Sequence, residues 1–379
     1  MFIRNSVAGI CLAAGTALAQ LAQPLNPASA IRFNLAPGAP VSVVSTDLGD
    51  SRIQPRGGAM ILDLHATLVL RNNGSQNVRG VTLVVLAQEM TPGGKGSVAV
   101  PSLNVPPGQS FPLKINLRLL RPLPAPAGPL VKVDLDGVLF ADLSFFGPNQ
   151  LESRRTMTAW EMEARRDREY LKSVLAEKGA AGLQQEVFAS LSRQQARPRL
   201  DVQVSRREPR AISAAVNALT THSVSFALLK IPDSPLELLS GEARVSGDEA
   251  ASPRIEVVNR SKLPVRYFEM GWIVKDSAGD QFLAGSIPAS SALDAGRSAT
   301  ATQDRTYKFT RSSQPLAAIS GMRGFVSQVE FANGQIWIPS RQDLASLLGI
   351  LPPSPEEQRL TELYRTKGLP ALIAELGKF

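Results

Sequence analysis

The sequence predicts a mainly β protein with added helices, in which two β-sandwiches stand in tandem and each is followed by a helix pair. The first observation is a repeat: Asn72 recurs 187 residues later as Asn259. Arg79 recurs at the same spacing as Arg266. The second is strand-like alternation of apolar and polar residues over 61–71, and the third is helical periodicity before each half ends. A fixed spacing of this kind indicates internal duplication.

The repeat continues into the helical sequence, where its spacing drifts to 189. Five pairs of residues share that spacing: Leu171 and Leu360, Lys178 and Lys367, Gly179 and Gly368, Leu183 and Leu372, and Glu186 and Glu375. The repeated unit is therefore a β domain together with the helices that follow it.

Seven segments follow from these patterns. They are a signal peptide (1–19), an extended leader (20–40), a first β-sandwich (41–150), a first helix pair (151–196), a linker (197–221), a second β-sandwich (222–340) and a C-terminal helix pair (341–379).

The amino terminus has the pattern of a secretory signal. Arg4 precedes an apolar run at 7–14, and Ala17-Leu18-Ala19 has the small-x-small form that signal peptidase cleaves. We expect export to the periplasm or beyond, with cleavage near Ala19. Cys11, the single cysteine, would leave with the signal, which excludes disulfides and thiolate chemistry from the mature chain. A lipoprotein is the less favoured alternative, because the residues before Cys11 fit a lipoprotein box poorly.

In the first half, the leucines at even positions from 62 to 70 should share the buried face of one strand. Residues 72–75 (Asn-Asn-Gly-Ser) then form a turn, and residues 81–87 are apolar on both faces, so the helix pair is expected to cover one of them. Asp136-Gly137 predicts a tight hairpin between 130–135 and 138–143.

For the helices, Thr158 and Glu161 match a capping box, and Gly179 should end the first helix in a left-handed conformation. Glu161 and Arg165 lie four apart and predict a solvated face. In the second copy, Ser354-Pro355-Glu356-Glu357 is a strong helix start, and Gly368 corresponds to Gly179.

The second sheet has its own signals. Trp272 alternates with Phe268 and Met270, which predicts a core position. Residues 276–280 should form a hairpin loop, and Asn333-Gly334 should turn a second hairpin.

A formal charge of +8 and a pI near 9.8 favour anionic partners such as envelope polymers or membrane surfaces. Because the excess is mostly arginine in a chain rich in Ala, Gly and Pro, we favour coding bias of a GC-rich genome as its cause. Export argues against nucleic acid, and the 7–14 run is too short for an integral membrane protein.

No constellation of catalytic residues, metal ligands or cofactor-binding residues stands out. His65 and His222 are the only histidines, and we interpret both as surface residues. There is no Gly-x-Ser-x-Gly elbow and no Ser-x-x-Lys pair, so a serine hydrolase is not expected. An enzyme that uses only carboxylates stays open, because paired carboxylates need proximity only in space.

Four residues are candidates for an interaction site. Arg206, Arg207 and Arg210 form a basic cluster that would suit an anionic glycan or lipid. Trp337 would suit sugar stacking if it faced outward, although we favour a core position for it.

The strand, Asn-rich turn and apolar strand of residues 68–86, followed by Pro107-Gly108-Gln109-Ser110, resemble immunoglobulin-like or fibronectin-type sandwich modules of uncharacterised exported bacterial proteins. This resemblance implies two tandem immunoglobulin-like β-sandwiches, from which the helix pairs depart. No functional residue carries over, because fold does not fix function.

The function hypothesis is an exported, non-enzymatic interaction or scaffold protein of the bacterial cell envelope that binds an envelope protein. The alternative is a binding module for envelope polysaccharide or another anionic polymer. The sequence does not indicate an oligomeric state.

Overall fold

Strands dominate the protein. The computed structural model of the chain describes residues 23–24, 30–88, 92–123, 128–197, 200–206, 221–311 and 314–379. Strands make up 49% of the described residues, which confirms the mainly β class. The expected signal peptide, parts of the leader and residues 207–220 of the expected linker lie outside the described residues.

The chain packs into two compact units. The first comprises residues up to 77, 82–99 and 105–136, and the second comprises residues 78–81, 100–104 and 137–379. Within the described residues, neither α-helix carries an apolar stretch of the length that crossing a bilayer requires.

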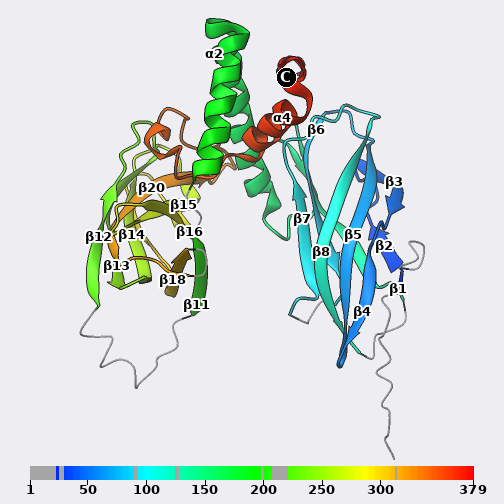
Figure 1. Cartoon of the computed structure of the whole chain (residues 1–379), viewed down its shortest axis with the longest axis horizontal. Helices are drawn as coiled ribbons and strands as arrows, with labels where there is room; N and C mark the ends of the chain where they lie inside the picture. The colour runs from blue at the N-terminus through cyan, green and yellow to red at the C-terminus, as the bar shows by residue number, and fades with distance from the viewer. Residues whose placement is uncertain are drawn as a thin grey trace, which may run out of the picture. The chain divides into compact units, whose positions relative to one another are not determined.

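Ten strands build two five-stranded sheets (Figure 1). One has the order β1-β4-β5-β3 with β8 on the other edge of β5, and the second has the order β10-β9-β6-β7 with β2 parallel to β9. The bounds are β1 Gln23–Pro24, β2 Ile31–Asn34, β3 Val41–Asp47, β4 Arg52–Arg56, β5 Ala59–Asn72, β6 Val78–Leu86, β7 Lys95–Val100, β8 Ser110–Pro122, β9 Val131–Phe140 and β10 Phe145–Phe146.

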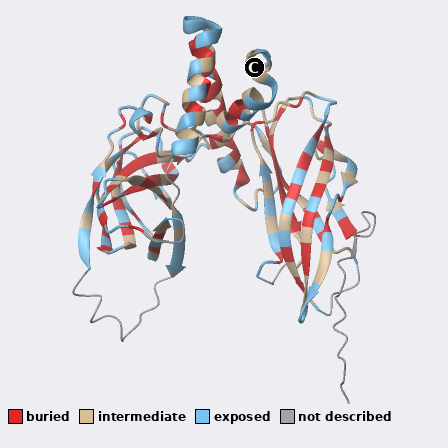
Figure 2. Ribbon diagram, viewed as in Figure 1, coloured by how far each residue is buried: buried red, intermediate tan, exposed pale blue. Residues whose placement is uncertain are grey.

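Strand β5 confirms the predicted alternation. Leu62, Leu64 and Leu68 are at most 1% exposed, whereas His65 on the opposite face is exposed (Figure 2). Strand β6 is buried on both faces, as its continuous apolar sequence predicts. At its start a Cβ on Gly80 would collide with the sulfur of Met157 in the first helix, so that helix packs directly on the backbone there.

The hairpin predicted at Asp136-Gly137 is wrong. Strand β9 runs straight through both residues, and the chain turns after Phe140 instead. Gly137 is needed for packing, because a Cβ there would overlap the ring of Phe145 on β10. The glycine of this Asp-Gly pair is therefore not a turn residue. It lets the Phe145 ring approach the backbone closely, which is another common reason for a glycine within a strand.

The second unit holds one continuous, nearly closed sheet of eleven strands. Its main order is β11-β18-β14-β13-β12-β20-β15-β16, with β17, β19 and β21 attached to β14, β18 and β20. The bounds are β11 Asp201–Arg206, β12 His222–Leu228, β13 Leu236–Ser246, β14 Glu249–Asn259, β15 Val265–Asp276, β16 Gln281–Leu293, β17 Ser298–Thr302, β18 Arg305–Arg311, β19 Gln314–Pro315, β20 Ile319–Phe331 and β21 Ile336–Trp337.

Strand β12 joins the two halves of this sheet, because it pairs antiparallel with β13 and then parallel with β20. The enclosed core is centred on Trp272, which is fully buried and stacks on Phe226 with edge contacts to Tyr307 and Phe309. This confirms the predicted core position of Trp272. The predicted loop at 276–280 and the turn at 333–334 are also confirmed.

Two long helices, α2 (Ser153–Ala196) and α4 (Pro355–Leu376), complete the second unit, with a short 3-10 helix, η1 (Ala345–Leu347). Helix α4 starts as predicted, with the Ser354 hydroxyl accepting a hydrogen bond from the Glu357 amide at 3.0 Å. The capping box predicted at Thr158 is wrong, because α2 already begins at Ser153 and places Thr158 and Glu161 inside the helix.

Each helix is interrupted at the predicted glycine. Gly179 has φ +66° and ψ −169°, and Gly368 has φ +78° and ψ −179°. The positive φ is as expected, but the extended ψ is a conformation that only glycine adopts readily, and not the left-handed helical one.

Side-chain contacts show that each helix folds back at its glycine. The Tyr170 hydroxyl interacts with Glu186, and Arg359 contacts Glu375 at 2.7 Å. Residues sixteen apart would lie about 24 Å apart in a straight helix, so both segments are helical hairpins. The two hairpins share one core, made of Leu171, Leu183, Val187, Leu360, Leu372 and Leu376.

The two asparagines of the repeat make the same contacts. Asn72 donates its side-chain amide to the carbonyls of Gln76 and Val105 at 2.8 and 2.9 Å. Asn259 donates to those of Leu263 and Leu293, both at 2.9 Å. Both asparagines are fully buried. Each asparagine therefore ties the end of its strand to two neighbouring loops.

We expect Asn259→Ala to lower the free energy of unfolding by about 2–4 kcal/mol, because two buried carbonyls lose their donor. Unfolding in urea followed by tryptophan fluorescence measures this, since all three tryptophans lie in the second unit. Lys262→Ala, at an exposed position close to Asn259 in the same unit, is the control and should change stability by less than about 0.5 kcal/mol. Equal effects of the two variants would contradict the proposed role of the buried amide.

Candidate functional site

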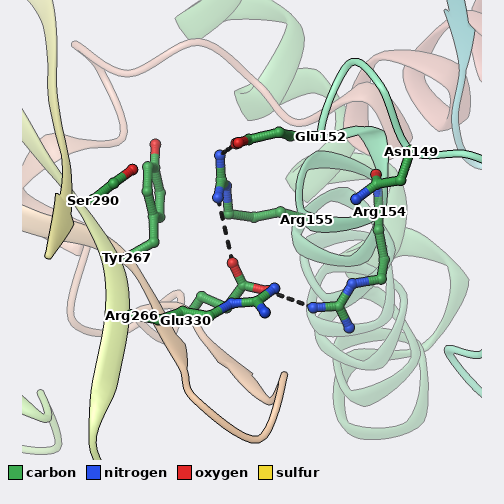
Figure 3. A pocket seen from close by; sticks show the side chains of 8 residues that line it. All are labelled: Asn149, Glu152, Arg154, Arg155, Arg266, Tyr267, Ser290 and Glu330. Carbon is green, nitrogen blue, oxygen red and sulfur yellow. Dashed lines mark hydrogen bonds and ion pairs between the residues drawn. The ribbon is translucent and has the colours of Figure 1, made fainter. Parts of the chain in front are cut away.

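A polar pocket of about 280 Å³ lies between the start of α2 and strands β15, β16 and β20 (Figure 3). Every residue around it is polar or aromatic, and three are arginines. The lining consists of Asn149, Glu152, Arg154, Arg155, Arg266, Tyr267, Ser290 and Glu330.

Glu330 is the centre of the site. Its side chain is fully buried, and its carboxylate contacts Arg154 at 2.6 Å, Arg155 at 3.4 Å and also Arg266. Two of these arginines come from α2 and one comes from β15. A buried carboxylate needs such partners, because an unpaired charge pays the full cost of desolvation. Glu330 thereby fixes the helix to the sheet.

The register of three strands places these side chains in one row. Tyr267 on β15 lies opposite Ser290 on β16 and opposite Glu330 on β20. Both pairings shift register between Val265 and Tyr267, so Arg266 sits in a β-bulge. A bulge re-aims a side chain, and here the Arg266 guanidinium reaches Glu330.

The helix side of the pocket is fixed by local backbone contacts. The Asn149 side-chain oxygen accepts a hydrogen bond from the Arg154 amide at 2.8 Å, which satisfies one free amide of the first turn. Gly334, in the turn after β20, leaves space for Arg154, because a Cβ there would lie 3.0 Å from its guanidinium. Its φ of +85° also favours glycine.

Arg155 is held between Tyr267 on β15 and Glu152 just before α2. Its guanidinium lies 3.6 Å from the centre of the Tyr267 ring and contacts the Glu152 carboxylate. Burial and the nearby Glu269 carboxylate raise the pKa of the Tyr267 phenol, and Arg155 offsets part of that shift. The Tyr267 phenol is therefore neutral, and its hydroxyl donates a hydrogen bond to the Glu269 carboxylate at 3.0 Å. This arrangement suits binding of an anion better than proton transfer.

A second charged cluster lies within the helices. Glu161 is 2% exposed and contacts Arg168 at 3.0 Å and Arg79 at 3.7 Å. Arg168 also reaches Glu356 at 3.2 Å. The predicted solvated face of Glu161 and Arg165 is therefore wrong on the glutamate side, because the hairpins and the start of β6 bury its carboxylate.

Asp167 is the counterpart of Glu356 in the first hairpin. It is 2% exposed, accepts a hydrogen bond from the Ser354 hydroxyl at 2.5 Å and contacts Arg341 at 3.4 Å. The N-terminal residue of α4 is thus tied to α2 by a direct side-chain bond. These contacts leave only small gaps in the cluster, with one pocket of about 10 Å³ beside Tyr170.

Glu163 on α2 is an acid with a strongly raised pKa. Burial is the main cause that raises the pKa of Glu163 to about 7, Arg166 offsets part of this shift, and Asp167 adds to it. The Glu163 carboxyl is therefore expected to titrate near neutral pH.

Of the residues singled out from the sequence, Trp337 does not line this pocket. Arg207 and Arg210 lie outside the described residues, and Arg206 is the last residue of β11, opposite Arg305 on β18. Trp337 on β21 is partly buried against the core of the second unit. Whether these residues serve an interaction stays a prediction.

Both histidines are exposed, as expected of surface residues. Among the described residues, no group of three or more His, Cys, Asp or Glu side chains is arranged to hold a metal ion.

The pocket residues were missed because they come from distant parts of the chain. Arg154 and Glu330 are 176 residues apart. One signal was present: Arg266 belongs to the 187-residue repeat, and an arginine repeated beside buried strand residues indicates a buried partner. The bulge that aims it is not visible in the sequence.

No protein-family model matches the chain, and no curated protein matches it. Among solved structures, a putative ApaA protein from Bordetella pertussis is similar over 38% of this chain and 90% of its own, with 14% identity and a TM-score of 0.17. Red sea bream transglutaminase is similar over 76% of this chain and 31% of its own, with 10% identity and a TM-score of 0.14.

A β-glucosidase from Kluyveromyces marxianus is similar over 72% of this chain and 45% of its own, with 10% identity and a TM-score of 0.15. Likenesses this weak establish neither a shared fold nor a shared activity.

We expect Glu330→Gln to lower the free energy of unfolding by about 3–5 kcal/mol, because three guanidinium groups lose their common buried partner. Urea unfolding of the second unit, followed by tryptophan fluorescence, measures the change. Glu237→Gln is the matched control, since Glu237 pairs with Arg260 and both side chains are about half exposed. It should cost less than about 1 kcal/mol. A small effect at Glu330 would show that the arginines do not depend on it.

The pKa of Glu163 predicts a pH dependence with a definite sign. Because the folded state keeps the proton up to about pH 7 and the unfolded state loses it near 4.5, the free energy of unfolding should fall as pH rises through this window. Glu163→Gln should remove this fall, and at pH 8 it should be more stable than wild type by at most about 3 kcal/mol.

Urea unfolding at pH 4 and pH 8 tests this, with Glu177→Gln at an exposed position of α2 as control. Parallel pH curves for wild type and Glu163→Gln would contradict the buried-acid interpretation.

Proposed function

We propose that the protein is an exported, non-enzymatic interaction or scaffold protein of the bacterial cell envelope. In this proposal a tandem duplication of an immunoglobulin-like β-sandwich, each copy followed by a helix pair, supplies the frame. The observation that carries the proposal is the shared core of the two helical hairpins, one hairpin from each proposed copy.

The pairing of residues in that core supports the duplication. Its six side chains are three pairs separated by 189 residues: Leu171 and Leu360, Leu183 and Leu372, and Val187 and Leu376. The contacts that close the two hairpins obey the same spacing, because Tyr170 corresponds to Arg359 and Glu186 to Glu375. Chance similarity would not place corresponding residues in mutual contact so regularly.

A packed pair of hairpins supports a scaffold because its core holds surface groups of the helices in place. Phe188 on α2 is 51% exposed and rests edge-on against Tyr364 of α4, with ring centres 5.6 Å apart. Large exposed aromatic side chains are typical anchors of protein interfaces. Phe188 therefore marks the outer face of the hairpins as the proposed contact for an envelope protein.

A second function, binding of an envelope polysaccharide or other anionic polymer, is favoured by one observation, the three arginines around the pocket at Glu330. The formal charge of +8 would add a general attraction that salt weakens.

Affinity capture from the cell-envelope extract with the chain 20–379 as bait tests the scaffold proposal. We expect a protein recovered in fixed stoichiometry at both low and moderate salt. Phe188→Ser should reduce its recovery about tenfold or more, since loss of an aromatic anchor costs at least about 2 kcal/mol of binding energy.

Val204→Ser is the control, because Val204 on β11 is similarly exposed at 48% but lies on the sheet. Recovery of polymer alone, or of nothing, would argue against the scaffold. Equal loss with both variants would argue against the helical face.

A further inference from the structure

We infer that the pocket around Arg154, Arg155 and Arg266 binds the carboxylate of an acidic sugar. This inference rests on the second proposed function, polymer binding, and names both its site and its ligand chemistry. It is carried by a preformed cavity that has a surplus of positive charge and of hydrogen-bond donors.

The charge of the lining matches a single anionic group. Among the residues that line the pocket, three guanidinium groups face two carboxylates, those of Glu330 and Glu152, which leaves one positive charge. The Glu269 carboxylate lies outside this lining and accepts the hydrogen bond of the Tyr267 hydroxyl. The pocket also lies at the first turn of α2, whose free amides add positive potential, and that turn contains no acidic residue. A monoanion neutralises this surplus, whereas a dianion would leave excess negative charge beside the buried Glu330.

The donors also exceed what the protein itself can use. Each guanidinium carries five N–H donors, so three provide about fifteen, whereas two carboxylates accept at about eight lone-pair positions. Arg266 is the most available, with 49% of its side chain exposed, compared with 30% for Arg154. A carboxylate is the group that this planar fork binds best.

The size and polarity of the cavity favour a sugar as the body of the ligand. About 280 Å³ corresponds to roughly nine water molecules at about 30 Å³ each, which is more than a carboxylate alone fills. Among the described residues that line the pocket none has an aliphatic side chain, while Asn149 and Ser290 offer an amide and a hydroxyl. Hydroxyl groups of a sugar match such a lining better than the methylene groups of an acidic peptide side chain do.

Contacts within the protein hold the arginines of the pocket in place. Glu330 holds all three arginines, and the Tyr267 ring supports Arg155 from one side at 3.6 Å. Binding therefore pays little for ordering these long side chains, which is the usual gain from preorganisation.

Titration calorimetry of the chain 20–379 with glucuronate and with glucose tests the inference, because these sugars differ only in the carboxylate. We expect one glucuronate site, weakened by added salt, and binding of glucose at least about tenfold weaker. Arg266→Gln should weaken glucuronate about tenfold or more, since it removes a charge-assisted bond while Glu330 keeps two partners. Arg260→Gln, at an exposed arginine outside the pocket, should leave it unchanged.

Several outcomes would overturn the inference. If glucose bound as tightly as glucuronate, the carboxylate would not be the group that is recognised. If inorganic phosphate or the dipeptide Ala-Glu bound as tightly as glucuronate, the sugar would not be recognised. An unaltered affinity in Arg266→Gln would place the site elsewhere. If that variant does not fold, Ser290→Leu fills the pocket without changing its charge and should abolish binding.

Retention of the chain on immobilised polyglucuronate separates this inference from the function on which it rests. Retention that survives Arg266→Gln, with a flat glucuronate titration, would overturn the pocket and leave polymer binding standing. Absence of both would overturn the two together.

Discussion

Pairing of buried carboxylates with arginine is the constraint on which the second unit depends. Glu161, Asp167, Glu330 and Glu356 are each at most 2% exposed. A carboxylate at such depth is tolerated only with a cation and further hydrogen bonds, so each one dictates where an arginine must lie. Glu330 in this way sets the position of α2 on the sheet, and Glu356 sets the position of α4 on α2.

Apolar burial supplies the driving force that these ion pairs do not. The six side chains of the hairpin core are each worth about 1.5–3 kcal/mol when fully buried. A leucine core alone would accept several sliding registers of the two hairpins. The bond from Ser354 to Asp167 and the contact from Arg168 to Glu356 each fit only one of them. Apolar contacts thus hold the hairpins together, and the polar contacts select their alignment.

This division explains which features could be predicted from the sequence. Periodicity and turn residues are local, so the β5 alternation, the Ser354 helix start and the breaks at Gly179 and Gly368 were predictable. Asp136-Gly137 misled because its local signal for a turn lost to a tertiary contact with Phe145.

The burial of charged residues was harder to predict from the sequence than the burial of apolar residues. A sequence shows that Glu161 lies four residues from Arg165, but not that another helix covers it, so the solvated interpretation was the natural one. The pocket at Glu330 needs a bulge at Arg266 and an arginine from 176 residues away. Neither leaves a local pattern. The repeated arginine was the one usable trace, and a repeat alone does not name the partner.

The proposed duplication sharpens the case for a specialised second copy. Tyr267 corresponds to Gly80 at the 187-residue spacing, and Ser290 corresponds to Ser102 at the 188-residue spacing that relates Val105 to Leu293. Glu330 corresponds to Leu139, because each pairs with the short strand that follows. The arginine and the serine are therefore shared, but the tyrosine and the acid are not. Arg79 forms an ion pair with the buried Glu161 and is itself largely buried, whereas about half of the Arg266 side chain is exposed at a cavity. Gly80 also removes the ring that supports an arginine in the second copy and admits Met157 instead. The first copy thus uses its arginine to anchor a helix, while the second adds an aromatic support and a buried acid, and leaves its arginine half exposed at the cavity.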